Sequence, residues 1–94
     1  MYGIIAQVKI DPANEDVARK ALLDVVVPTA KSMAGFTNGT WLRALEGDRG
    51  ISVLLFESEQ AALAAAERMR SEGPPAGAPV TMESIDVFEV LAQA

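Results

Sequence analysis

The chain has 94 residues, half of them hydrophobic, and a formal net charge of −5 at pH 7. That length suits one domain over residues 1–94, and the apolar content supports a core without disulfides or structural metals. The sequence contains no Cys and no His. It therefore excludes thiolate chemistry, and it excludes imidazole as a metal ligand or general base.

Charge and hydropathy exclude two classes of partner. The eight basic residues are scattered among thirteen acidic ones, so the basic stripe typical of a nucleic-acid-binding protein is missing. The longest apolar runs, such as residues 53–56, are far shorter than the ~20 residues that span a bilayer. The N-terminal segment has no basic region and no cleavage-like site. We expect a cytoplasmic protein with no nucleic acid, membrane, metal or cofactor partner.

The chain divides into six predicted elements. Residues 2–10 alternate as a strand does, and Asp11-Pro12 then opens a helix. Pro28 inside that helix predicts a kink. Ser58 is a suitable cap for the second helix and Gly73 a suitable end. The elements are strand, helix, strand, strand, helix and strand, over residues 2–10, 12–34, 36–45, 51–56, 59–72 and 80–91.

That order predicts an α+β, ferredoxin-like (βαββαβ) fold, with an antiparallel sheet and both helices on one face. The other face has nothing left to cover it, although the strands are apolar on both faces. In the fourth strand we expect Val80, Met82, Phe88 and Val90 on one face, and Ile85, Val87 and Leu91 on the other. A second copy is the simplest cover, which predicts a homodimer with its sheets face to face, a dimeric α/β barrel. A monomer with a mildly apolar face is the alternative.

The hairpin between the second and third strands carries the candidate ligand-binding residues. A turn centred on residues 48–49 pairs Trp41 with Phe56, Arg43 with Leu54, and Leu45 with Ser52, all facing the helices. Trp41 and Arg43 would form an aromatic wall with one cation, suited to a planar anionic or phenolic ligand. The hydroxyls that can reach this pocket from the strands belong to Ser52 and Tyr2. The candidate pocket is therefore Trp41, Arg43, Ser52, Phe56 and Tyr2.

Two alternatives to this site stay open. Trp41 and Arg43 could be ordinary packing, with the guanidinium reaching solvent at an edge. A slip of one residue in the hairpin would instead turn both toward the second copy.

Two stretches carry a family resemblance. Pro28 is followed by Ala34-Gly35-Phe36, and the third strand ends in Phe56-Glu57-Ser58-Glu59-Gln60-Ala61. With the element order, these stretches resemble the antibiotic-biosynthesis-monooxygenase-like family of dimeric α/β barrels. The resemblance implies a pocket between helices and sheet. It also implies an activity such as cofactor-free oxygenation of a phenolic compound, or haem degradation in a related branch.

The family's functional residues match poorly. The Asn, Trp and Tyr of its cofactor-free oxygenases fall at Ser52, Phe56 and Ala62, and the first-strand Asn of the haem-degrading branch falls near Ala6. The His of that branch has no counterpart. We therefore expect a small-ligand-binding protein, with cofactor-independent oxygenation of an aromatic or phenolic compound as the enzymatic form of that function. The alternatives are an isomerase-type dimeric-barrel enzyme using Arg43 and a carboxylate, and a non-catalytic binding or structural module.

Overall fold

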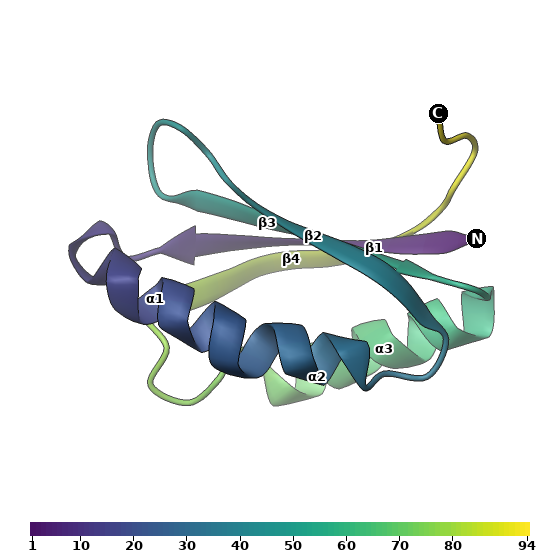
Figure 1. The fold of residues 1–94 in the computed structure, drawn as a ribbon, viewed down its shortest axis with the longest axis horizontal. Coiled ribbons are helices and arrows are strands. Elements are labelled where there is room, and N and C mark those ends of the chain that lie inside the picture. Colours follow the sequence, from purple (N-terminus) through teal and green to yellow (C-terminus); the bar gives the residue numbers. More distant parts are fainter.

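Two helical segments lie side by side in one layer and cover one face of a four-stranded antiparallel sheet (Figure 1). The structure is a computed structural model that describes all residues 1–94, and its strand order is β2-β3-β1-β4. The ferredoxin-like fold expected from the sequence is confirmed. The elements are β1 (Tyr2–Ile10), a 3-10 turn (Pro12–Asn14), α1 (Glu15–Ala21), a π-helical segment (Leu22–Val26), α2 (Val27–Lys31), β2 (Phe36–Arg43), β3 (Arg49–Phe56), α3 (Glu59–Glu72) and β4 (Val80–Glu89).

Both helical segments begin at the caps that the sequence predicts. The Asp11 carboxylate accepts a hydrogen bond from the Ala13 N–H at 3.0 Å, and the Ser58 hydroxyl accepts one from the Ala61 N–H at 3.1 Å. Gly35 has a φ of 77°, and a side chain there would also meet the Cβ of Ala61 at 2.7 Å. Glycine is therefore needed where the chain leaves the first helical segment and passes close to α3. None of the helices combines the length and the apolar character needed to cross a bilayer.

The first helical segment is not the single α-helix expected over residues 12–34. Residues 15–31 form a continuous helix, called the long helix below, whose middle is π-helical over Leu22–Val26. Pro28 has no N–H to give to the carbonyl of Asp24, so regular α-helical bonding cannot continue through this turn. Here the N–H of Val27 reaches back to the carbonyl of Leu22. The wider turn lies immediately before the proline, as π-bulges commonly do where a helix is interrupted.

The core lies between α3 and the centre of the sheet. Ala62 and Ala66 are fully buried, and their small side chains let α3 lie close against Ile4 and Phe56, which are also fully buried. Phe36 packs edge-on against Phe56, with ring centroids 5.8 Å apart. Burying a side chain the size of Ile4 or Phe56 contributes ~1.5–3 kcal/mol. This cluster fixes α3, β1 and β3 relative to one another.

The opposite face of the sheet has no helix over it (Figure 1). The pairing of the strands puts a set of apolar side chains on this open face, and Leu42 and Phe88 there are about half exposed. The set, called the open-face cluster below, consists of Ile5, Leu42, Ile51, Val53, Leu55 and Phe88.

The face of the sheet predicted for Trp41 and Arg43 is confirmed, but the predicted pairing is wrong. Trp41 pairs with Ser52 rather than Phe56, and Arg43 pairs with Gly50 rather than Leu54. Leu45 lies beyond the end of β2 and is 99% exposed. The true reversal is centred nearer residues 46–47, which shifts the register by four residues. An even shift keeps every side chain on its face, so both residues still point toward the helices.

Two bulges adjust which side chains face the helices. In β4, the register shifts between its pairing with Gln7 and with Val8, so Met82 and Ile85 lie on the same face of the sheet. The strict alternation expected for residues 80–91, which separated Met82 from Ile85, is therefore wrong. In β2, Thr37 is the extra residue between Phe36 and Asn38, and its hydroxyl donates to the Leu55 carbonyl at 3.0 Å.

Gly39 makes room for the indole ring of Trp41. A Cβ on Gly39 would lie 2.9 Å from Trp41 Cη2, 2.9 Å from Leu54 Cδ2 and 3.2 Å from Phe36 Cζ. The ring therefore approaches the bare backbone of its own strand, where Leu54 and Phe36 also lie close. Glycine at this position is what allows the only tryptophan to lie so close to the strand.

We expect Gly39→Ala to displace the Trp41 ring and to lower the free energy of unfolding by ~1–3 kcal/mol, the usual cost of overpacking. Urea denaturation measures the loss, and the emission maximum of the single tryptophan reports the displacement. Gly3→Ala is the control, since its Cβ would meet the end of the Leu55 side chain at 3.2 Å and, at an ordinary contact distance of 3.6 Å, the carbonyl oxygen of Leu54. Equal effects of the two variants on stability and on emission would contradict this account.

Candidate functional site

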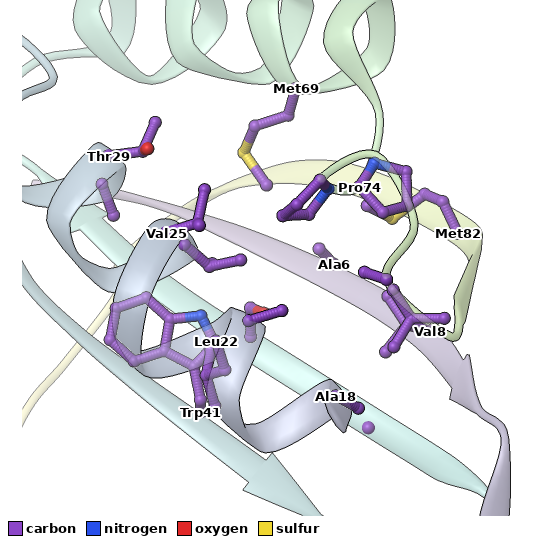
Figure 2. A pocket seen from close by; sticks show the side chains of 18 of the residues that line it. Ala6, Val8, Ala18, Leu22, Val25, Thr29, Trp41, Met69, Pro74 and Met82 are labelled. Atoms are coloured by element: carbon purple, nitrogen blue, oxygen red, sulfur yellow. The ribbon is translucent and has the colours of Figure 1, made fainter. Parts of the chain in front are cut away.

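A pocket of ~750 Å³ lies between the long helix, α3 and the sheet. Hydrophobic residues make up 20 of the 31 that line it. Figure 2 shows side chains converging on the space from three sides: Leu22 and Val25 from the long helix, Met69 and Pro74 from α3 and the loop after it, and Trp41 from the sheet. α3 packs against β1, β3 and β4, whereas the long helix makes few contacts with the sheet over residues 15–26, and a space stays open there. Pockets of this size and character bind small organic ligands.

Three of the five candidate pocket residues are brought together here. Trp41, Arg43 and Ser52 all line the pocket, and Trp41 and Ser52 are direct cross-strand neighbours. Phe56 is fully buried in the core beneath α3, and Tyr2 packs on that same core. Neither Phe56 nor Tyr2 is among the residues that line the pocket. The four-residue register shift explains the difference, because it pairs Phe56 with Phe36 rather than with Trp41.

Trp41 brings an unsatisfied hydrogen-bond donor to the pocket. Its Nε1 atom is buried and has no hydrogen-bond partner, and Figure 2 shows this nitrogen turned toward the interior of the pocket. A buried donor left unpaired costs ~1–3 kcal/mol. An acceptor oxygen on a bound molecule would remove that cost, so this part of the wall favours a ligand that carries a carbonyl, phenol or similar group.

Charged side chains lie at the edges of the pocket. Arg43 on β2 forms an ion pair with Glu15 at the start of the long helix, and Arg19 approaches the same carboxylate oxygen at 3.6 Å. Farther along the pocket, Arg68 on α3 pairs with Glu72 at 2.6 Å. All five residues line the pocket. The site is therefore an apolar chamber with a polar rim.

A further ion pair on the long helix lies outside the pocket. Lys20 Nζ donates a hydrogen bond to Asp24 Oδ2 at 2.8 Å. This hydrogen bond, together with the charge of Asp24, raises the pKa of Lys20 above its ordinary value. Both side chains lie in solvent, so the pair supports the helix surface only.

Sequence reasoning missed most of the helical wall. Leu22 and Val25 belong to an apolar stripe that is equally typical of a helix packed tightly on a sheet. Pro74 lies in the loop between α3 and β4, and no pattern in the sequence indicates what this loop packs against. For Glu15, the spacing in the sequence indicates only an i,i+4 pair with Arg19 within the helix. Its ion pair with Arg43 joins residues 28 positions apart, and no local pattern signals such a contact.

The resemblance to the monooxygenase-like family aligns its functional residues with four positions of this chain, and these positions divide between the core and the pocket. Phe56 and Ala62 are fully buried in the core cluster, whereas Ser52 and Ala6 line the pocket. The side chains at these positions offer one hydroxyl, from Ser52. The polar chemistry of this pocket therefore resides in Trp41, in the hydroxyls of Ser52 and Thr29, and in the charged rim.

Comparison with known proteins identifies the fold. No family model and no curated protein matches the sequence. Among solved structures, the haem degrader MhuD of Mycobacterium tuberculosis, with two haems bound in its active site, is similar with a TM-score of 0.78 and 21% identity. The match covers 100% of this chain and 99% of that one.

Two monooxygenase structures are also similar. An antibiotic biosynthesis monooxygenase matches with a TM-score of 0.71 and 14% identity, over 98% of this chain and 100% of that one. A monooxygenase of Streptomyces coelicolor, in complex with nanaomycin D, matches with a TM-score of 0.62 and 16% identity, over 99% and 89%. The chain thus has the ferredoxin-like fold found in antibiotic biosynthesis monooxygenases and in the haem degrader MhuD.

Proposed function

We propose that this protein binds a small, mainly apolar aromatic compound in the pocket between the long helix, α3 and the sheet. The observation that carries the proposal is the combination of an apolar chamber of ~750 Å³ with a buried, unpartnered indole N–H in its wall. Trp41 offers a flat aromatic surface for stacking and a donor for one ligand oxygen. Ser52, directly across the strand pair, adds a hydroxyl.

The similar structures support a ligand-binding role for this fold. MhuD holds two haems in its active site, and the Streptomyces monooxygenase is in complex with nanaomycin D. In this chain the corresponding use of the fold would be a pocket for an organic molecule that enters between helices and sheet.

Cofactor-independent oxygenation of a phenolic compound is the second candidate function. The likeness to antibiotic biosynthesis monooxygenases favours it. In such a reaction the enzyme holds the activated phenol next to oxygen and excludes water. Oxygen uptake on adding a phenol that binds, with no added cofactor or metal, would separate this function from binding alone.

Haem does not fit the donor set of this pocket. The lining residues include no His, Cys or Tyr, and the atoms among them closest in character to haem ligands are the thioethers of Met33, Met69 and Met82.

We also propose that the protein is a homodimer in which the open-face clusters of two copies pack together. The cluster lies on the face of the sheet that no helix covers, and its members Leu42 and Phe88 are 51% and 49% exposed. An apolar sheet face of this kind is typically covered, and a two-fold axis covers both copies at once.

Binding of a planar phenol or quinone should quench the fluorescence of Trp41, because it is the only tryptophan and lines the pocket. Ser52→Leu should weaken this quenching at least ~10-fold, since a leucine beside Trp41 occupies ligand space. Ser71→Leu, on exposed helix surface, is the control for the same change of side chain. A panel of phenols and quinones that leaves the emission of the folded wild-type protein unchanged would contradict the proposed function.

Added haem should form no stoichiometric complex with a shifted Soret band, because the pocket supplies no strong axial ligand. Absorption titration with haemin measures this directly. Tight 1:1 binding with a band that changes in the Met69→Leu variant would show that a thioether ligates the iron, and would overturn the expectation.

The wild-type protein should run in light scattering at about twice its chain mass of 9.9 kDa. Val53→Lys places a charge in the middle of the open-face cluster, and we expect it to give monomer or aggregate. Ala64→Lys, on the exposed side of α3, should leave the assembly unchanged. A wild-type mass of one chain at micromolar concentration would refute the dimer.

A further inference from the structure

We propose that the ligand of this pocket is an anion whose charged group replaces Glu15 as the partner of Arg43. The inference rests on the proposed function, because it specifies the chemistry of the ligand in the same pocket. It assigns Arg43 the role of selecting acidic compounds, and it assigns Glu15 the role of an internal competitor that occupies the cation when no ligand is bound.

The geometry at the rim leaves one positive charge unbalanced. A single carboxylate oxygen, Glu15 Oε1, serves both Arg43 Nη1 and Arg19 Nη2. Two guanidinium groups each carry a full charge and several donors, so one carboxylate cannot satisfy both. A second carboxylate, brought by a ligand, would complete the pairing.

The whole pocket shows the same excess. Its lining includes three arginines, Arg19, Arg43 and Arg68, and two glutamates, Glu15 and Glu72, which gives a net charge of +1. The complete chain has a net charge of −5. A pocket that is locally positive on an acidic protein attracts small anions while the rest of the surface repels them.

The ion pair is also placed where it can be exchanged. Its two side chains are 47% and 36% exposed, and solvated pairs of this kind hold together weakly. Arg43 follows Trp41 by two residues on the same face of β2, which separates their Cα atoms by ~7 Å. One molecule can therefore place an acceptor against the indole N–H and an anionic group against the guanidinium.

The test compares anthraquinone-2-carboxylate with its neutral carboxamide, which have the same rings and nearly the same shape. Calorimetry and Trp41 quenching give both affinities. We expect the wild-type protein to bind the carboxylate ~10-fold more tightly, as a charge-assisted, two-pronged pair allows. Arg43→Met should remove this preference while keeping the affinity for the carboxamide.

Glu15→Gln is the decisive variant. It removes the competing negative charge but keeps an oxygen that can accept from Arg43, so the fold should be preserved. Affinity for the carboxylate should rise ~3-fold, in keeping with the modest strength of an exposed ion pair, and affinity for the carboxamide should stay constant. Glu72→Gln, which removes the same charge from the far edge of the pocket, is the matched control and should have a smaller effect.

The outcomes separate this inference from the function on which it rests. Equal wild-type binding of carboxylate and carboxamide would overturn anion selection while leaving the aromatic binding pocket intact. Unchanged or weaker carboxylate binding in Glu15→Gln would overturn the exchange at Arg43. If the folded wild-type protein bound neither compound, the proposed function itself would fail, and the inference with it.

Discussion

The close approach of α3 to the sheet is the constraint on which the other features depend. Ala62, Ala65 and Ala66 face β1 and β3 with side chains of a single methyl group, so the helix can lie directly on Ile4 and Phe56. The long helix has larger side chains, Leu22 and Val25 among them, and makes few contacts with the sheet over residues 15–26. This difference in packing between the two helices leaves the pocket open, and bulky residues at the three alanine positions would disturb it by pushing α3 away from the sheet.

The long helix is shaped by Pro28, and its irregular turn lies at the pocket wall. The π-helical residues Leu22, Leu23, Val25 and Val26 all line the space. A π-bulge inserts an extra residue into the turn and rotates the residues that follow, which broadens the apolar surface available on one side. The same residue that interrupts the helix therefore helps to present a wide hydrophobic wall to the ligand.

Much of the fold could be predicted because its signals are local. The bounds of β1 and α3, the caps at Asp11 and Ser58, and the order of elements follow from period, capping and glycine placement. The residues that line the pocket were harder to predict, because the pairing of β2 with β3 depends on a loop without a defining turn motif. The predicted side of the sheet for Trp41 and Arg43 was still correct, since the error was an even number of residues. The β4 bulge and the Glu15–Arg43 pair depend on tertiary contacts, and neither has a local signature.

The bulge at Thr37 determines the phase of the whole of β2. Phe36 and Trp41 are five residues apart, an odd interval that would put them on opposite faces of a regular strand, yet both face the helices because Thr37 is the extra residue between them. Phe36 is anchored on Phe56 in the core. The bulge, as much as the composition of the strand, therefore decides whether Trp41 faces the helices. A regular strand over the same residues, with Phe36 kept in place, would present Asn38, Thr40 and Leu42 to the pocket instead, whereas deletion of Thr37 would leave an even interval of four residues and keep Trp41 on its face without any bulge.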